Sequence, residues 1–182
     1  EKPIQDYKSY QVTKTGISPR LVPGQGVIVR ANSYEHNDFG YTIEAPDWII
    51  KMNDKRIRKQ EGLEKEIKKL KPISIFGKGK NLIIGWGSTK GAIVDALFKL
   101  KNFRFLQISY LKPFPKEEVI REIKKSAKVI LVENNATGLL GDIIAEQTGY
   151  IIKNKILKYD ARPFTSEYLV KEIQSRQWKL KI

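Results

Sequence analysis

The segment from Lys128 to Gly149 constrains the fold more than any other part of the sequence. Its aliphatic run, residues 129–132, has the composition of a strand that is buried on both faces. A polar turn, Glu133–Gly138, follows, and Asn and Gly tolerate the left-handed backbone that such turns need. Apolar residues then recur at helical spacing up to a glycine cap. The segment is therefore predicted to be one strand–turn–helix unit.

Strand-like and helix-like segments alternate through most of the chain. The predicted strands are Ile73–Phe76, Leu82–Ile84, Phe103–Tyr110, Val129–Val132 and Lys155–Tyr159. The predicted helices are Lys90–Leu100 (with Phe98 on its inner side), Lys116–Lys125, Leu139–Thr148 and Thr165–Gln174. This alternation predicts an α/β fold: a three-layer αβα arrangement with a mostly parallel, open sheet and right-handed crossovers.

The first part of the chain has a different character. Short strands are predicted at Tyr7–Val12 and Val27–Val29, and the polar segment Ala31–Gly40 is predicted to be a long loop, which is more often functional than a simple connector. A helix is predicted from Pro46 to about Leu70. We therefore expect two domains: residues 1–71, an irregular extension with a linking helix, and residues 72–182, the α/β domain. Because the sequence begins at Glu1 without Met, we expect a fragment or a separately folded part of a longer protein.

The composition excludes several kinds of chemistry. The sequence contains no cysteine, which excludes disulfides, thiolate metal sites and cysteine nucleophiles, and fits a cytoplasmic location. A single histidine, His36, excludes a His-rich metal site. No apolar run approaches the length of about 18 residues that a membrane-spanning helix needs, so no membrane association is expected.

The net charge of +14 allows two interpretations. A basic surface is typical of proteins that bind nucleic acid or an acidic partner. A lysine- and isoleucine-rich proteome, in which lysine covers every solvated face, explains the same excess. The basic residues are spread along the chain rather than gathered with aromatic residues, so nucleic-acid binding is the less favoured interpretation. A stand-alone basic binding module stays open as the alternative function.

Two polar motifs are better explained by structure than by chemistry. Gly85–Gly91 follows a strand and opens a helix, but its glycine spacing is one residue longer than the dinucleotide fingerprint, so a tight turn is favoured. His36, Asp38 and Ser33 do not form a catalytic triad by spacing. An ordinary structural histidine is the favoured interpretation of His36, and a hydrogen bond to a substrate in a cleft is the alternative.

A series of short motifs along nearly the whole chain resembles the carboxyl-terminal part of the alpha subunit of 2-oxoacid:ferredoxin oxidoreductases. The more specific motifs are Gly16-Ile17-Ser18-Pro19-Arg20 with Pro23-Gly24, and Ala31 to Gly40. The others are Ile50-Lys51-Met52 with Lys55-Arg56, Gly85 to Thr89, Tyr110 to Pro115, Val132 to Asn135 and Gly138 to Gly141. These later motifs also resemble the wider group of transketolase carboxyl-terminal domains, whose fold the resemblance implies for residues 72–182.

The resemblance implies an enzyme that decarboxylates 2-oxoacids oxidatively to acyl-CoA. Thiamin diphosphate and coenzyme A take part, and electrons pass through iron–sulfur clusters to ferredoxin. The Tyr-Pro-Ile-Thr-Pro motif of the pyrimidine-binding domain does not occur here, and the thiamin-diphosphate signature does not fit Gly141-Asp142, because Asn134-Asn135 precede it. The resemblance places the diphosphate and Mg in the beta subunit. This chain alone is therefore expected to bind no cofactor or metal and to be inactive, with the beta subunit as its partner and ferredoxin and coenzyme A reached through the complex.

Within that resemblance we expect the chain to contribute subunit assembly and the lining of a cleft. Arg20 is predicted to pair with a substrate carboxylate and His36 to lie close to the substrate. Glu133, Asn134 and Asn135, at the carboxyl end of a central strand, are predicted to lie at a subunit junction.

Overall fold

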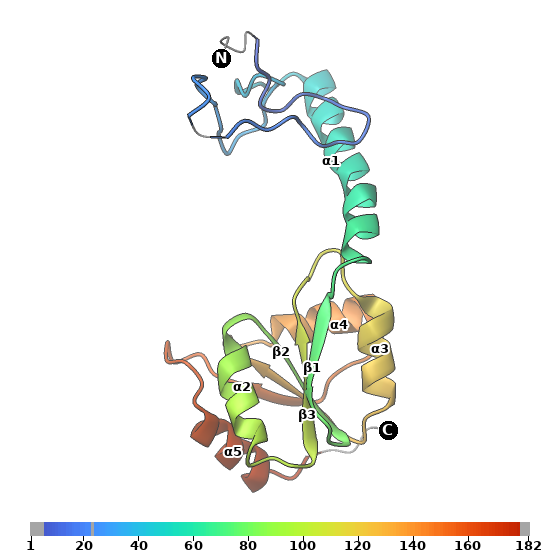
Figure 1. Ribbon diagram of the computed structural model, residues 1–182, viewed down its shortest axis with the longest axis vertical. Helices are drawn as coiled ribbons and strands as arrows, with labels where there is room; N and C mark the ends of the chain where they lie inside the picture. Colours follow the sequence, from blue (N-terminus) through green and yellow to red (C-terminus); the bar gives the residue numbers. More distant parts are fainter. Residues whose placement is uncertain (1–5, 23, 179–182) are drawn as a thin grey trace. The chain divides into compact units, whose positions relative to one another are not determined.

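The computed structural model describes residues 6–22 and 24–178, which form two compact units (Figure 1). The amino-terminal unit extends to Lys69, and the α/β unit begins at Leu70. Pro23, part of one of the motifs above, lies outside the described residues.

A single long helix, α1 (Pro46–Ile67), runs through the amino-terminal unit. Proline in its first turn and Asp47 beside it suit the amino end of a helix, where the backbone amides lack partners and the helix dipole is positive. Gly62 lies inside the helix without interrupting it. Met52 and Lys55 are the buried residues of α1, and its other residues are exposed or half-buried.

The short strands predicted at Tyr7–Val12 and Val27–Val29 are wrong, because the described residues of both segments form turns and irregular backbone. The β-type pairing in this unit is one isolated bridge between His36 and Thr42. A strand needs a neighbouring strand to satisfy the hydrogen bonds of its backbone groups. In this unit, turns and side chains provide hydrogen-bond partners for the backbone instead. The side-chain oxygen of Asn37, for example, accepts hydrogen bonds from the amides of Phe39 and Tyr41.

The α/β unit is built on a five-stranded sheet with the order β1-β3-β2-β4-β5. The strands are β1 (Ile73–Gly77), β2 (Asn81–Trp86), β3 (Phe103–Ile108), β4 (Val129–Glu133) and β5 (Asn154–Leu157). β1 pairs with β3 in antiparallel fashion, and the other three pairings are parallel. The predicted mostly parallel open sheet is confirmed.

Helices cover both faces of this sheet (Figure 1). They are α2 (Lys90–Leu97), α3 (Lys116–Lys124), α4 (Leu139–Thr148) and α5 (Ser166–Ser175), with a short 3₁₀ turn η1 (Gly87–Thr89) ahead of α2. Alternate residues of β4 point to opposite faces, so Leu131 packs with α3 and α4, whereas Ile130 packs with α2 and α5. The three-layer αβα architecture predicted for this part is therefore confirmed.

Two local predictions differ in their outcome. Phe98 was expected on the inner side of a helix, but α2 ends at Leu97 and the Phe98 side chain is 80% exposed. The caps agree with expectation: Gly149 ends α4 in the left-handed conformation at φ +74°, and the Thr165 hydroxyl accepts a hydrogen bond from the amide of Tyr168 at the start of α5.

The sheet topology brings three turns to one edge. β2 lies between β3 and β4, so the chain leaves β2 for a neighbour on one side and later returns to a neighbour on the other. In open α/β sheets, ligands and partners commonly contact the protein outside the carboxyl ends of the strands at such a switch point. The turns after β2, β4 and β5 meet at this edge.

Every helix in residues 6–22 and 24–178 is too short or too polar to span a membrane.

Candidate functional site

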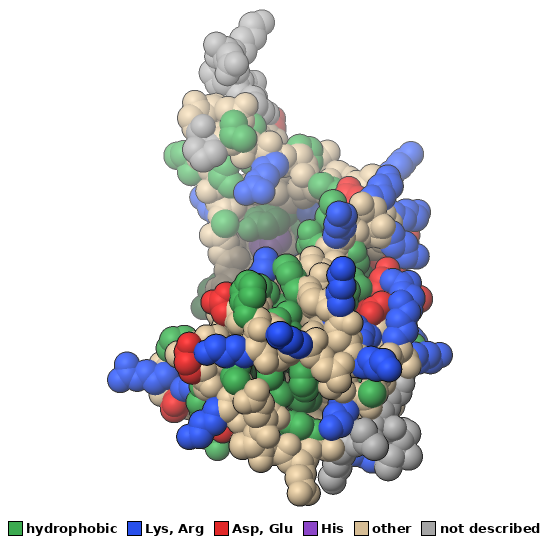
Figure 2. Space-filling view, turned by 60° about the horizontal axis from the view of Figure 1, so that its bottom comes forward, with side chains coloured by type: hydrophobic (Ala, Val, Ile, Leu, Met, Phe, Trp, Pro, Cys, Tyr) green, Lys and Arg blue, Asp and Glu red, His purple; other side chains and the backbone are tan. Residues whose placement is uncertain are grey.

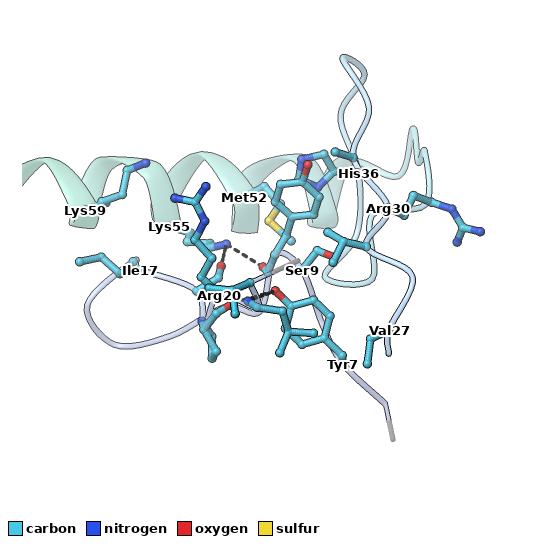
Figure 3. A pocket seen from close by; sticks show the side chains of 18 of the residues that line it. Tyr7, Ser9, Ile17, Arg20, Val27, Arg30, His36, Met52, Lys55 and Lys59 are labelled. Atoms are coloured by element: carbon cyan, nitrogen blue, oxygen red, sulfur yellow. Dashed lines mark hydrogen bonds between the residues drawn. The ribbon is translucent and has the colours of Figure 1, made fainter. Parts of the chain in front are cut away.

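The main candidate site is a cavity of about 940 Å³ within the amino-terminal unit (Figure 3). Residues of the loops before residue 37 form one side, and Met52, Lys55, Arg56 and Lys59 of α1 form the other. Both residues that the sequence predicts near the substrate, Arg20 and His36, line this cavity.

The loop that carries Arg20 is seated directly on α1. Gly16 has φ +77°, and a Cβ atom at this position would lie 2.4 Å from the carbonyl oxygen of Lys55, so only glycine fits. The Lys55 ammonium donates hydrogen bonds to the Tyr10 carbonyl at 2.7 Å and to the Ser18 hydroxyl at 2.5 Å. Burial, and then the nearby charges of Lys59 and Arg56, lower the pKa of Lys55.

The backbone on either side of Arg20 is held by one hydroxyl group. Tyr7 donates to the carbonyl of Pro19 at 3.0 Å and accepts from the amide of Leu21 at 3.3 Å. The Arg20 side chain is exposed, and it forms no ion pair within the part of the chain that the structure describes. Its guanidinium is therefore available to an anion, whereas its backbone is fixed.

His36 is almost buried, with 8% of its surface exposed. Its ring stacks on Tyr10 with a centroid distance of 3.6 Å, and Nδ1 lies 3.1 Å from the carbonyl oxygen of Asn37. A carbonyl can only accept a hydrogen bond, so Nδ1 is the donor in this contact, and Nε2 is the ring nitrogen that the contact does not engage. Asp38 is ion-paired with Lys8 at 2.7 Å, which agrees with the sequence argument against a triad.

The cavity is lined by basic side chains, and no Asp or Glu occurs among its described lining residues. Arg56 is neutralised by a bidentate pair with Glu35, at 3.2 and 2.5 Å, and hydrogen bonding from Arg56 is the main cause that lowers the pKa of Glu35. Arg30 lies over the Tyr41 ring at 3.9 Å and points away from the other labelled residues (Figure 3). Among the arginines that line the cavity, Arg20 is therefore the one best suited to meet a carboxylate.

In the α/β unit, the predicted junction residue Glu133 is fully buried. Its carboxylate accepts hydrogen bonds from the Leu140 amide at 3.0 Å, from Asn135 Nδ2 at 2.9 Å and from the Trp86 indole at 3.3 Å. A carboxylate at the amino end of α4 is also favoured by the helix dipole. Glu133 therefore joins the turn after β2 to the start of α4, a structural role inside the unit.

The two neighbouring asparagines divide between the interior and the surface. Asn135 Oδ1 accepts from the amides of Gly138 and Thr137, which fixes the turn. Asn134 is exposed and lines two small cavities of about 330 and 460 Å³ at the carboxyl edge of the sheet, one with Trp86 and one with Arg162. Of the three predicted junction residues, Asn134 is the one that presents its side chain outward.

Metal chemistry finds no support in the described residues, which contain no group of three or more His, Cys, Asp or Glu side chains able to hold an ion. Asp142 is 65% exposed on α4 and lies 3.8 Å from the Lys155 ammonium, as expected of a helix-surface residue. The Lys and Arg side chains of the α/β unit are scattered over the face that Figure 2 brings forward and do not form one stripe.

Sequence reasoning did not find the residues that shape the cavity. Tyr7 was noted as part of a strand, and Lys55 only as part of a motif. The contacts that give them their positions join Lys55 to Tyr10 across 45 positions, and Tyr7 to Leu21 across 14. No local spacing could reveal such contacts. The glycine at position 16 was the available signal that a backbone approaches closely there.

The fold and the site together define a chain with an α/β domain built on a mostly parallel open sheet and an amino-terminal unit that holds a cavity with basic lining residues. No protein-family model matches the chain. It is 35% identical over 166 residues to 2-oxoacid:ferredoxin oxidoreductase 1, subunit alpha, of Sulfurisphaera tokodaii, covering 90% of this chain and 26% of that protein. It is 32% identical over 176 residues to the 2-oxoacid:ferredoxin oxidoreductase alpha subunit of Saccharolobus solfataricus, covering 93% of this chain and 28% of that protein.

A solved structure agrees with these relatives. The 2-oxoglutarate:ferredoxin oxidoreductase from Magnetococcus marinus, with 2-oxoglutarate, coenzyme A and succinyl-CoA bound, superposes with a TM-score of 0.64 at 27% identity, covering 92% of this chain and 30% of that chain. The chain is similar to the carboxyl-terminal part of 2-oxoacid:ferredoxin oxidoreductase alpha subunits, and it spans about a quarter of the length of these curated relatives. The predicted resemblance is confirmed, and it is favoured over the alternative of a stand-alone basic module.

Proposed function

We propose that this chain acts as part of the alpha subunit of an enzyme that decarboxylates a 2-oxoacid oxidatively to an acyl-CoA and reduces ferredoxin. Its own contribution is to line the substrate cleft and to dock other parts of the complex. The observation that carries the proposal is the basic cavity that brings Arg20 and His36 into one lining.

Arg20 is proposed to bind the carboxylate of the 2-oxoacid. A guanidinium offers two parallel N–H donors that match a carboxylate, and charge-assisted hydrogen bonds of this kind are about twice as strong as neutral ones. His36 would orient the substrate through Nε2, since its Nδ1 proton is engaged by the Asn37 carbonyl. The stacking on Tyr10 holds the ring in place for this purpose.

The amino-terminal unit is proposed to be covered by another polypeptide. Among its described residues, Met52 is the one large hydrophobic side chain that is buried. The large hydrophobic residues that are exposed in this unit are Ile17, Val22, Ile28, Val29, Tyr34, Phe39, Tyr41, Ile50 and Ile57. Exposed apolar surface on this scale marks an interaction site. The rest of the alpha subunit, or the beta subunit, is the proposed cover.

A second contact surface is proposed at the carboxyl edge of the α/β unit. Trp86, Leu139 and Tyr159 are 40%, 56% and 73% exposed there, next to the outward-facing Asn134. Aromatic residues beside a few polar groups are typical of the centre of protein–protein interfaces. Glu133 and Asn135 would support this junction from inside by fixing Trp86 and the turn.

The cofactors of the complex are proposed to bind elsewhere. The sequence has no cysteine, so its residues do not fit an iron–sulfur cluster. Thiamin diphosphate and Mg are likewise assigned to other parts of the complex, since the described residues offer no metal-binding group. The cytoplasmic location stays a prediction from the composition.

The test is a set of substitutions in the complete enzyme complex. Arg20→Ala is expected to raise KM for the 2-oxoacid by at least about tenfold, the loss of one charge-assisted hydrogen-bonded pair of about 1.5–3 kcal/mol. His36→Ala is expected to lower kcat/KM for the same substrate. Arg121→Ala is the control, because Arg121 is an exposed arginine on α3 outside the cavity, and it should leave both constants unchanged. An unchanged KM in the Arg20→Ala enzyme would contradict the proposal.

A further inference from the structure

Hydrogen bonds from Tyr7 and Lys55 hold the loop that carries Arg20. We propose that Tyr7 and Lys55 are positioning residues, which hold Arg20 ready for the carboxylate of the substrate. This inference rests on the proposed function of Arg20, and it assigns a further role to two residues outside the predicted site.

The Tyr7 hydroxyl is the contact nearest to Arg20. It bonds the residue before Arg20, through the Pro19 carbonyl, and the residue after it, through the Leu21 amide. These two bonds fix the peptide groups on both sides of Arg20. The single proton of the hydroxyl is used by Pro19, so Tyr7 has none to donate to a substrate.

The Lys55 ammonium holds the same loop two residues earlier. Lys55 is only 7% exposed, and a buried charge is tolerated only when it is well hydrogen-bonded. Its two hydrogen bonds tie Ser18 and the Tyr10 carbonyl to α1. The Ser18 hydroxyl in turn donates a hydrogen bond to the carbonyl of Gln11. The close approach of Gly16 to the Lys55 carbonyl seats the loop against the helix. The loop that leads to Arg20 is thereby anchored to the most regular element of the unit.

Such an arrangement matters because binding is weaker when a loop must be ordered at the same time. Immobilising a flexible side chain or loop on binding costs free energy, and a site that is ordered in advance avoids this cost. The two anchors are 14 and 37 residues from their partners in the loop, which shows that the folded unit, and not the loop alone, sets the position of Arg20.

The main test is Tyr7→Phe in the complete enzyme complex, which deletes one hydroxyl and keeps the ring. KM for the 2-oxoacid should rise about three- to tenfold, the value of one or two neutral hydrogen bonds. The KM for coenzyme A and kcat should stay within about twofold. Tyr168→Phe on α5 is the matched control, because it deletes a hydroxyl in the other unit, away from the residues that line the cavity, and it should change none of these constants. A merely structural role would instead change all three constants together, and that result would overturn the inference.

A double-substitution cycle separates this inference from the proposed function. If Tyr7 acts through Arg20, Tyr7→Phe should have almost no further effect on KM when Arg20 is already Ala. An equal rise of KM in both backgrounds would overturn the inference while leaving the role of Arg20 intact. If Arg20→Ala itself leaves KM unchanged, the proposed function fails instead.

A second pair of variants tests the Lys55 anchor. Ser18→Ala removes one partner of Lys55 without burying a new group and should raise KM for the 2-oxoacid less than Tyr7→Phe does. Lys55→Met removes the charge and both bonds, and its effect on KM should again disappear in the Arg20→Ala background. If neither variant changes KM, Lys55 is not a positioning residue. If Lys55→Met does not assemble, Ser18→Ala alone decides.

Discussion

The interiors of the two units are stabilised by different kinds of contact. The α/β unit has two continuous apolar cores, one on each face of its sheet, and the inner strand β4 is buried along its whole length. Among the described residues of the amino-terminal unit, Met52 is the one large apolar side chain that is buried, and the other buried side chains include His36 and Lys55. One unit is therefore stabilised mainly by apolar burial, and the other by hydrogen bonds and ion pairs around a cavity. This difference supports the proposal that another polypeptide completes the amino-terminal unit.

The largest expected effect lies in the core of the α/β unit. Leu131→Ala should lower the free energy of unfolding of this unit by about 2–5 kcal/mol, since it leaves a cavity in a fully packed core. Denaturant unfolding of the 182-residue chain measures the change. Ile151→Ala, at a side chain that is 69% exposed, is the control and should change it by less than about 0.5 kcal/mol. Equal effects of the two would contradict the packing described for this unit.

Glu133→Gln is expected to have the next largest effect. The amide keeps the shape of the side chain but turns one acceptor into a donor, which leaves a buried amide such as that of Leu140 without a partner. The free energy of unfolding of the α/β unit should fall by about 1–3 kcal/mol. Glu146→Gln on the exposed side of α4 is the matched control. No loss of stability in Glu133→Gln would show that the carboxylate does not support the junction.

Met52→Ala sharpens the comparison between the units. Its effect should be smaller than that of Leu131→Ala, about 1–2 kcal/mol, because loops around a poorly packed site can collapse into the space. Amide hydrogen exchange should accelerate in α1 and in the loops before it, with no change in the α/β unit. A loss of protection across both units would mean that they do not behave as separate structures.

The smallest effect is the pH dependence of the loop that carries His36. Because Arg56 lowers the pKa of Glu35, the Glu35–Arg56 pair stabilises the folded loop above the pKa of 4.5 for the unfolded group, and this contribution is lost as the pH falls through the lower pKa of the folded state. Hydrogen exchange of the amides in residues 32–40 should therefore accelerate below about pH 4.5, beyond the intrinsic effect of pH. Glu35→Gln should abolish this dependence. A loop that responds in the same way with Gln at position 35 would contradict the assigned role of the pair.

The sequence predicted the α/β unit well because its information is local. In the segment from Lys128 to Gly149, composition and spacing alone predict the strand, the turn and the helix, and the structure agrees with each. The prediction of strands at Tyr7–Val12 and Val27–Val29 was wrong, because these segments have a β-like composition but no neighbouring strand to pair with. The prediction that Phe98 lies on the inner side of a helix was also wrong. Helical spacing predicts an inward side chain, but α2 ends one residue earlier and Phe98 is exposed.

The candidate site was predicted only in part. Arg20 and His36 were found through a resemblance, and the structure places both in one cavity lining. The hydroxyl of Tyr7 and the ammonium of Lys55 were missed, because what they do depends on partners far away in the sequence. Glu133 was predicted as a junction residue, but its hydrogen bonds inside the unit were not, because their donors lie on β2, in the following turn and on α4.

Hydrogen exchange of the chain alone and within the complete enzyme complex tests the central claim most directly. If another polypeptide completes the amino-terminal unit, the amides of residues 6–45 should exchange rapidly in the isolated chain and become strongly protected in the complex. The buried strands of the α/β unit should be protected in both. Equal protection of residues 6–45 in the two samples would contradict the account, because the unit would then be complete by itself.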